Sequence, residues 1–156
     1  YVYDKGSESC YKFHRQAQAW SKAYATCKAE GAYLAIINSQ LESVVLKDLF
    51  AKNPTNTLNG STDHHTAFSF VGIRDWLDGG SWRTVKGQSL VDAGFIGWAS
   101  GEPNNVHGGI EHCVSITRAG TYNDISCDYL LSFICEKEPE VHEVTYFHTL
   151  LRGYVF

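Results

Sequence analysis

Gly101-Glu102-Pro103-Asn104-Asn105 opens the stretch of sequence that decides the fold, which continues through Glu111-His112-Cys113 to Tyr122-Asn123-Asp124-Ile125-Ser126-Cys127. Two carboxylates and an amide precede the first cysteine, and an amide and a carboxylate precede the second. If Cys113 and Cys127 form a disulfide, the two segments lie side by side and five oxygen-bearing side chains converge. Ca2+ takes about six to eight oxygen ligands, whereas Zn2+ prefers nitrogen and sulfur. The stretch therefore predicts a calcium site.

Length and charge limit the classes of protein to which the chain can belong. Its 156 residues are enough for one domain with a sizeable core, and a second domain is not expected. The net charge is -4 and the basic residues are scattered, so we expect no nucleic-acid partner and no anionic membrane partner. No apolar run approaches the roughly 18 residues of a membrane span. Because the sequence has neither a signal peptide nor a methionine, we interpret it as a processed mature chain or an excised segment.

The cysteines indicate the compartment of the protein. They are either buried free thiols of a cytosolic protein or the disulfide framework of a secreted one, and their wide spacing without a C-x-x-C pair favours secretion. An odd cysteine is then left over. Asn59-Gly60-Ser61 is an N-glycosylation sequon in a polar stretch, which agrees with secretion, although such triplets also occur by chance. The five cysteines are Cys10, Cys27, Cys113, Cys127 and Cys135.

The first part of the chain predicts a hairpin and then a helix. Aromatic residues within 1–13 flank a turn at Lys5-Gly6-Ser7, as expected for two short strands. From 17 to 30 the larger apolar residues recur at three- and four-residue spacing, which is typical of a helix face. Gly31 supplies the stop, and Cys27 is expected to face the core.

A second helix is expected after a short apolar run. Ser39 and Glu42, three residues apart, form a capping box for a helix that runs to about Ala51. The spacing of its apolar residues predicts one buried stripe. The stripe consists of Leu41, Val45 and Leu49.

The rest of the chain predicts strands and loops. Residues 53–66 are polar and are read as a loop. Residues 86–105 contain only isolated apolar residues, and such a long irregular segment in a compact domain usually carries function. Two early helices followed by strands indicate an α+β fold with antiparallel sheets. The expected strands cover residues 68–73, 81–85, 113–117 and 131–136.

Motifs spread along the chain form one consistent set: the Trp20 to Cys27 helix, Glu30-Gly31-Ala32-Tyr33-Leu34, Phe70-Val71-Gly72-Ile73, Trp98, Glu102-Pro103-Asn104, Asn123-Asp124 and the terminal cysteines. Together they resemble a C-type lectin-like domain over residues 1–137. The runs Tyr11-Lys12-Phe13-His14-Arg15 and Ala35-Ile36-Ile37-Asn38-Ser39 further resemble secreted insect immune lectins that act as pattern-recognition proteins. The resemblance implies two helices, antiparallel sheets and a long loop that binds calcium and sugar.

The resemblance also implies a disulfide pattern. It pairs Cys27 with Cys135 and Cys113 with Cys127, and it leaves Cys10 spare. In the long form of the family, a cysteine at the position of Cys10 pairs with one further upstream. Cys10 is therefore either a free buried thiol or the source of a bridge to another chain.

Calcium is the cofactor that the resemblance implies. Its ligands would be Glu102, Asn104, Glu111, Asn123 and Asp124, and the first four would also contact the sugar. The proline of the Glu-Pro-Asn motif should follow a cis bond, as in the family. A second calcium site is doubtful, because Asp75 matches one of its carboxylates but non-acidic residues stand at the others. These residues are Gly79, Asn105 and His112.

The ligand set predicts how a sugar would bind. Each of two vicinal hydroxyls can coordinate Ca2+, accept a hydrogen bond from an Asn amide and donate one to a Glu carboxylate. The order Glu-Pro-Asn resembles the mannose-type motif rather than the galactose-type Gln-Pro-Asp, so we expect mannose, fucose or N-acetylglucosamine. These sugars would belong to glycans or glycolipids on microbial or cell surfaces. The expected protein is a secreted, non-enzymatic lectin of innate immunity.

Residues 1–138 form the expected carbohydrate-recognition domain, and 139–156 form an apolar extension. The extension could pack on its own domain, exchange with a neighbour or lead to another domain, and a contact in a homo-oligomer is slightly favoured. Two rival functions stay open: a hydrolase built from histidines, and a lectin-like domain that binds a protein or lipopolysaccharide with calcium dispensable. The histidines in question are His64, His65, His107 and His112.

Overall fold

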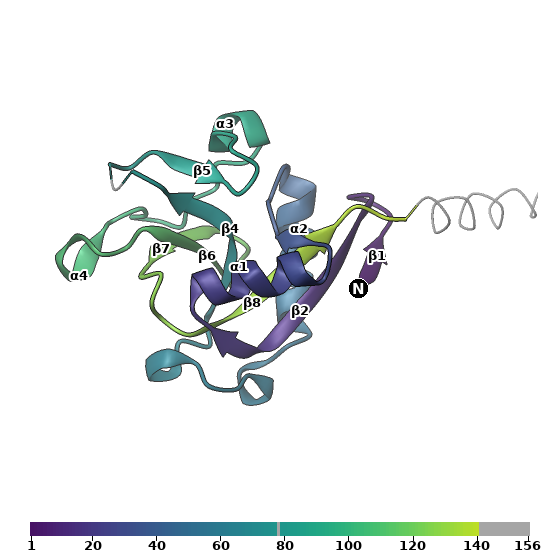
Figure 1. Cartoon of the computed structure of the whole chain (residues 1–156), viewed down its shortest axis with the longest axis horizontal. Helices are drawn as coiled ribbons and strands as arrows, with labels where there is room; N and C mark the ends of the chain where they lie inside the picture. Colours follow the sequence, from purple (N-terminus) through teal and green to yellow (C-terminus); the bar gives the residue numbers. More distant parts are fainter. Residues whose placement is uncertain (78, 141–156) are drawn as a thin grey trace, which may run out of the picture.

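The structure is a computed structural model that describes residues 1–77 and 79–140 of the chain (Figure 1). Two longer helices lie near the N-terminus, two short 3-10 helices, η1 (Thr55–Thr57) and η2 (Thr62–His64), follow α2, and two four-residue helices lie in later loops. The elements in chain order are β1 (Val2–Asp4), β2 (Ser9–Gln18), α1 (Trp20–Ala29), β3 (Tyr33–Leu34), α2 (Gln40–Ala51), β4 (Phe68–Asp75), β5 (Trp82–Thr84), α3 (Leu90–Ala93), α4 (Val106–Gly109), β6 (Cys113–Thr117), β7 (Tyr122–Ile125) and β8 (Leu131–Lys137).

One sheet joins the strands in the order β1-β2-β8-β4-β6-β7, with β3 paired to β8 and β5 paired to β4. The α+β class is confirmed. The pairs are antiparallel as expected, except that β4 and β8 run parallel. A parallel pair needs a long crossover, and the loops and strands between β4 and β8 provide it. Because β8 pairs with β2, the last strand lies beside the N-terminal hairpin, as Figure 1 shows.

Helix α1 begins later than the sequence pattern predicts. Ala17 and Gln18 belong to β2 instead, since Gln18 pairs with Leu131 of β8. The predicted inward face is otherwise present, and Cys27 is fully buried on it. After the helix, Gly31 adopts a positive φ of 71°, a conformation that suits glycine.

Helix α2 has the predicted N-cap but a different buried face. The Ser39 hydroxyl accepts a hydrogen bond from the backbone N–H of Glu42 at 3.1 Å, which confirms the cap. The prediction that Leu41 is buried is wrong, because its side chain is 52% exposed. The helix is rotated by one residue from the prediction, so that Glu42, Leu46 and Phe50 point inward.

The polar residue in this stripe is tolerated because its carboxylate is hydrogen-bonded. Glu42 accepts a bond from the Tyr11 hydroxyl at 2.5 Å and one from the backbone N–H of Asn38 at 2.7 Å. A buried carboxylate without such partners would be strongly destabilising. Glu42 therefore ties α2 to β2 and to the segment after β3, a role that its place in a predicted capping box did not indicate.

Two buried clusters form the core, and the disulfides lie in the second. The first cluster packs α2 against the sheet, and the second packs α1 against β3, β4 and β8. The structure pairs Cys27 with Cys135 and Cys113 with Cys127, as the resemblance implied. Cys10 forms no disulfide and is 2% exposed. This burial makes a disulfide to another chain less accessible.

The structure adds two strands that the sequence pattern missed, β3 and β7. Asn123 and Asp124 resemble turn formers, yet both lie in β7, which pairs with β6 over four residue pairs. The buried ring of Tyr122 anchors this strand in the core. Between β5 and β6 the chain is mostly irregular, as expected.

Two further expectations concern Asn59 and the C-terminal extension. Asn59 is exposed, and its backbone bonds to Arg15 and Ala17 of β2, so its side chain is accessible for the predicted glycosylation. The apolar extension 139–156 lies outside the described residues from 141 onward. Within the described residues, no helix is long and apolar enough to cross a bilayer.

Candidate functional site

The predicted ligands gather where the loop before β6 meets β7. Glu102 and Asn104 come from the loop before α4, Glu111 follows α4, and Asn123 and Asp124 lie in β7. In Figure 1 this region forms one end of the molecule, around the label α4. The antiparallel β6–β7 pair and the Cys113–Cys127 disulfide hold the two segments together.

Asp124 is the centre of the hydrogen bonds that shape the loop. It is 1% exposed, and its carboxylate accepts bonds from the backbone N–H groups of Asn104 at 3.0 Å and Asn105 at 2.7 Å. The Glu102–Pro103 bond just before them is cis, as expected. The side chains of Glu102 and Asn104 on either side of the proline contact each other, because Asn104 Nδ2 donates to Glu102 Oε1 at 2.9 Å.

Hydrogen bonds to the backbone also hold Glu111 and Asn123 in place. Glu111 Oε2 accepts a bond from the backbone N–H of Val106 at 3.1 Å, and the backbone N–H of Glu111 donates to Asn105 Oδ1 at 3.2 Å. Asn123 Nδ2 donates to the backbone carbonyl of Asp124 at 2.9 Å. Asn105 is therefore a structural residue of the loop, and sequence reasoning considered it only as a missing ligand.

The site concentrates negative charge. Burial, together with the carboxylates of Asp124 and Glu111, raises the pKa of Glu102 to about 7. Glu102 Oε2 is buried and has no hydrogen-bond partner among the described residues. Below this pKa, the Glu102 carboxyl is protonated and neutral. Above it, the carboxylate is charged, and no hydrogen-bond donor among the described residues contacts its Oε2.

These features fit a hard cation. The donors among the described side chains of this cluster are carboxylate and amide oxygens, which are the ligands that Ca2+ prefers. A buried carboxylate oxygen without a partner is an uncommon and costly feature. A Ca2+ ion would remove that cost by coordinating Glu102 Oε2 and neutralising its neighbours. Glu102, Asn104, Glu111, Asn123 and Asp124 are the residues that could hold the ion.

The doubtful second site contains one carboxylate that is already engaged. Asp75 accepts bonds from the backbone N–H groups of Gly79 at 3.3 Å and Gly80 at 2.7 Å, and His112 Nδ1 lies 3.7 Å from it. Burial would raise the pKa of Asp75, but the N–H groups of the loop outweigh it and lower the pKa. In the described residues Asp75 thus closes the loop after β4, and nothing adds a second acidic ligand at Gly79, Asn105 or His112.

A cavity of about 170 Å3 lies beside the oxygen cluster. Asn104, Glu111, Asn123 and Asp124 line one side of it. The rest of its lining is largely apolar or aromatic, and the rings of His65 and Tyr129 pack together there with their centroids 5.0 Å apart. Sequence reasoning missed this wall, because its members lie in separate loops with no common spacing. The other members are Phe68, Val106 and Ile125.

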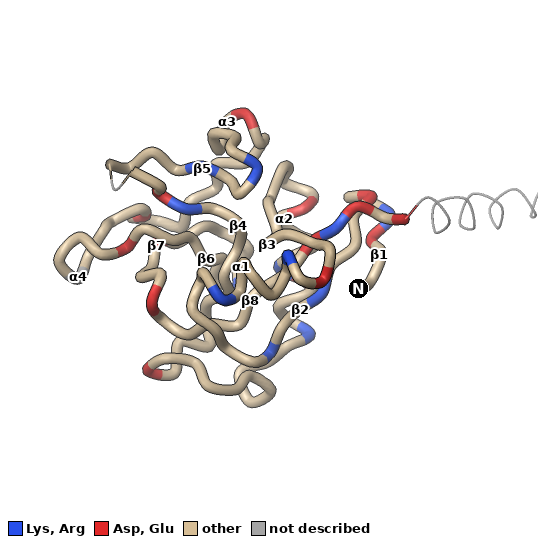
Figure 2. Tube along the Cα trace, viewed as in Figure 1, with Lys and Arg blue, Asp and Glu red and all other residues tan. Residues whose placement is uncertain are grey.

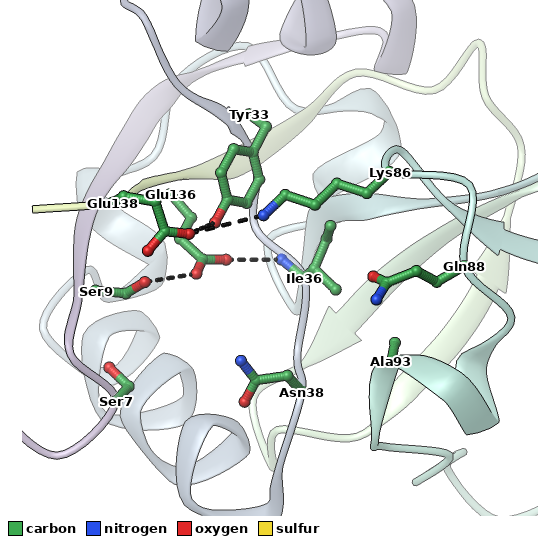
Figure 3. Close-up of a pocket in the computed structure, with 10 residues that line it drawn as sticks. All are labelled: Ser7, Ser9, Tyr33, Ile36, Asn38, Lys86, Gln88, Ala93, Glu136 and Glu138. Atoms are coloured by element: carbon green, nitrogen blue, oxygen red, sulfur yellow. Dashed lines mark hydrogen bonds and ion pairs between the residues drawn. The ribbon is translucent and has the colours of Figure 1, made fainter.

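A second polar cavity, of about 330 Å3, lies between β8 and the loop before α3 (Figure 3). Glu136 accepts bonds from the Ser9 hydroxyl at 2.8 Å and from the backbone N–H of Ile36 at 3.0 Å. On its rim, the Tyr33 hydroxyl donates to Glu138 at 3.1 Å. Figure 3 shows these bonds crossing from β8 to neighbouring segments. The carboxylates of this cavity therefore connect the strands of the scaffold.

The chain is similar to known proteins. Residues 16–137 match the family described as the lectin C-type domain. The chain is 40% identical over 129 residues to the hemolymph lipopolysaccharide-binding protein of Periplaneta americana, covering 82% of this chain and 48% of that protein. It is 33% identical over 129 residues to CD209 antigen-like protein D of Mus musculus, covering 83% of this chain and 48% of that protein. The chain thus spans about half the length of these relatives.

Solved structures superimpose on this fold. The carbohydrate-recognition domain of the mouse scavenger receptor C-type lectin superimposes with a TM-score of 0.69 at 27% identity, covering 85% of this chain and 92% of that one. A calcium-independent type II antifreeze protein superimposes with a TM-score of 0.65 at 23% identity, covering 84% and 87%, and shares the fold. The family match covers residues 16–137, which is more than half of the chain. The chain belongs to the C-type lectin domain family.

Proposed function

We propose that the chain binds mannose-type sugars through a calcium ion, as a secreted pattern-recognition lectin of innate immunity without catalytic turnover. The observation that carries the proposal is the buried, unpartnered oxygen of Glu102 amid the carboxylates of Asp124 and Glu111. A cation would balance the charge of this oxygen. The cluster is accessible to a ligand from solvent, since Glu102 is partly exposed and Asn104 is exposed. Calcium would supply an electrophilic centre for sugar hydroxyls.

The protein groups around that centre match the needs of a hydroxyl pair. Asn104 Nδ2 and Glu102 Oε1 bond to each other at 2.9 Å. A hydroxyl placed between them would replace this bond by accepting from the amide and donating to the carboxylate. Glu111 and Asn123 would serve a second, vicinal hydroxyl in the same way. Mannose, fucose and N-acetylglucosamine present suitable pairs.

A glycan array probed with and without EDTA tests the proposal directly. Binding to mannose-type sugars that disappears with EDTA is expected, and binding that survives EDTA would refute the mechanism. The double variant Glu102→Gln, Asn104→Asp exchanges the acceptor and the donor, so its preference should shift toward galactose. Unchanged preference for mannose would contradict the hydrogen-bond scheme.

A lipopolysaccharide or protein partner with calcium dispensable is the second candidate. It is favoured by the 40% identity to a hemolymph protein named for binding lipopolysaccharide. That name also supports secretion and a microbial glycolipid as the source of the sugar. Including lipopolysaccharide on the array separates the two candidates, because only the first loses its signal with EDTA.

Recognition by several sites at once would strengthen a weak site. Two hydroxyls at an open site give affinity of about millimolar, or roughly 4 kcal/mol. Useful binding therefore needs several sites, and we propose a homo-oligomer. The burial of Cys10 favours non-covalent assembly over a disulfide. Light scattering and non-reducing gels would test this proposal; a monomer would contradict it.

A further inference from the structure

Helix α2 carries apolar side chains on two sides. Leu46 and Phe50 point into the core. Leu41 and Val44 lie on the outer side of the helix and are 52% and 43% exposed. A surface helix typically has polar residues opposite its core-facing side. The outer side of α2 departs from this pattern, which indicates that a further segment covers it.

Strand β1 extends this apolar surface. A cavity of about 260 Å3 is lined by residues of β1 and α2. Val2, which is 71% exposed, lines it from the strand, and Val45 and Leu49 line it from the helix. Exposed apolar side chains grouped around a cavity commonly mark a binding surface. We call this surface the β1–α2 face, and its residues are Val2, Tyr3, Leu41, Val44, Val45 and Leu49.

The β1–α2 face also carries both signs of charge. Asp48 and Lys52 line the cavity, and neither forms an ion pair within residues 1–77 and 79–140. Figure 2 shows acidic and basic residues together along β1 and the end of β8. An apolar segment with one acid and one base therefore suits this face better than a segment with a large net charge.

The chain itself contains a segment of this composition. Residues 141–156 carry one acidic residue, Glu143, and one Lys or Arg residue, Arg152. Burying apolar side chains away from water is favourable, and more than half of the residues of this segment are apolar or aromatic. They are Val141, Val144, Tyr146, Phe147, Leu150, Leu151, Tyr154, Val155 and Phe156.

Strand β8, which precedes this segment, ends close to the β1–α2 face. Lys137 of β8 pairs with Cys10 of β2, and Cys10 pairs with Tyr3 of β1. Neighbouring strands lie about 4.8 Å apart, so Tyr3 is roughly 10 Å from Lys137. An extended chain spans about 3.3 Å per residue, so residues 138–140 are long enough to cross this distance. In Figure 1, β1 and the end of β8 lie together at the end of the molecule away from α4.

This short distance favours the segment of the same chain over that of a second copy. A segment joined to its binding surface by a short flexible linker has an effective concentration of about millimolar. A second copy competes only when the protein itself approaches that concentration.

We propose that residues 141–156 bind the β1–α2 face of their own chain and place apolar side chains in the cavity between β1 and α2. The segment then covers Val2, Leu41 and Val44. The oxygen cluster around α4 lies at the other end of the molecule and stays open to a sugar (Figure 1). The proposal does not depend on calcium or sugar, and it leaves the homo-oligomer proposed above to another surface.

Thiol labelling of the full chain measures the cover directly. Val2→Cys and Leu41→Cys each place a cysteine on the β1–α2 face. Val91→Cys places one in α3 and is the matched control, because Val91 is 74% exposed and Val2 is 71% exposed. The native cysteines add little to the reaction with a neutral maleimide, since four form disulfides and Cys10 is 2% exposed.

The face cysteines should react slowly. Burying even one leucine-sized side chain favours the covered state by at least about tenfold, so Val2→Cys and Leu41→Cys should react at least about tenfold more slowly than Val91→Cys. Their rates should not change with protein concentration, because the covering segment belongs to the same chain.

Each rate is then measured again after the segment is altered. Phe147→Ser, Leu150→Ser and Leu151→Ser together remove apolar contacts, so both face cysteines should react at least about tenfold faster while Val91→Cys is unchanged. Comparing the same cysteine with and without these changes cancels differences in thiol pKa between sites. Thr145→Ser with Thr149→Ser keeps the apolar residues and should change no rate.

Three results would overturn the proposal. Face cysteines that react as fast as Val91→Cys show that the face is uncovered. Face cysteines that stay slow after the triple change are covered by another part of the chain. A reaction that slows only as protein concentration rises over about a hundredfold range assigns the cover to a second copy.

Discussion

The effect of Glu102→Gln on the free energy of unfolding should have opposite signs with and without calcium. Without calcium, the wild type holds a partly buried carboxylate near two others, and the variant replaces it by a neutral amide of similar shape. The variant should therefore be the more stable protein in EDTA at pH 8. With calcium, the wild type gains the energy of ion binding, while the variant has lost one charged ligand. The wild type should then be the more stable protein.

The cost without calcium follows from the pKa of Glu102. A carboxyl with a raised pKa is stabilising below its unfolded value and loses that contribution as pH rises through the folded value. The shift from 4.5 to about 7 corresponds to at most about 3 kcal/mol, and partial exposure to solvent reduces it to on the order of 1 kcal/mol. The difference between variant and wild type in EDTA should appear between pH 5 and pH 8, at roughly those values.

The gain with calcium follows from mass action. Extracellular modules bind calcium with Kd of about 0.1 to 1 mM. At about 10 mM calcium the wild type should gain about 1.4 to 2.7 kcal/mol. For a domain of this size, each kcal/mol shifts Tm by about 2 to 4 °C. We therefore expect Tm to rise by roughly 3 to 10 °C in the wild type and by clearly less in Glu102→Gln.

Differential scanning calorimetry in EDTA and in calcium, at pH 5 and pH 8, measures all of these quantities. Glu8→Gln removes an exposed carboxylate from the β1–β2 turn and serves as the control, with an unchanged response to calcium. A wild type with the same Tm in EDTA and in calcium would refute the calcium site. A Glu102→Gln variant that is less stable in both buffers would refute the electrostatic reasoning.

Three further outcomes test the scaffold. Burial and the nearby Glu136 raise the pKa of Glu42, so its ionisation costs stability as pH rises. In thermal melts, Glu42→Gln should therefore lose less stability than the wild type between pH 5 and pH 8. Replacing Cys113 and Cys127 by alanine opens a loop with a sequence separation of 14 and should cost about 3 kcal/mol in urea melts, with a weaker response to calcium. Gly72→Ala would make its Cβ clash with the backbone oxygen of Leu34 in β3 and should cost about 2 to 3 kcal/mol in the same assay.

The sequence predicted the features whose signals are local or motif-like. The cap at Ser39, the buried Cys27 and the strand that begins at Phe68 each depend on the residues of one segment, and the structure contains all three. The two disulfides came from resemblance and not from spacing, since five cysteines allow several pairings. The Glu-Pro-Asn motif likewise located the loop, but not the hydrogen bonds that shape it.

The features that the sequence did not predict depend on tertiary contacts. Leu41 satisfies the helical period as well as Leu46 does, and only the position of the sheet decides which of them is buried. Asp124 looks like a turn former, yet the pairing with β6 places it in a strand. Glu42 fits the sequence pattern of a capping box, yet its carboxylate accepts a hydrogen bond from Tyr11 of β2, which is 31 residues away along the chain. In each case the missing information is the neighbour across space.

The hydrogen bonds of the site indicate how calcium binding and folding are related. Backbone N–H groups of Asn104 and Asn105 hold the carboxylate of Asp124, and that of Val106 holds Glu111. Each of these bonds joins two groups of the chain, so contacts within the loop hold its ligands in place. Ion binding then needs little reorganisation, and its free energy appears as added stability rather than as folding of the domain. EDTA should consequently abolish sugar binding while the fold, with its two disulfides, remains.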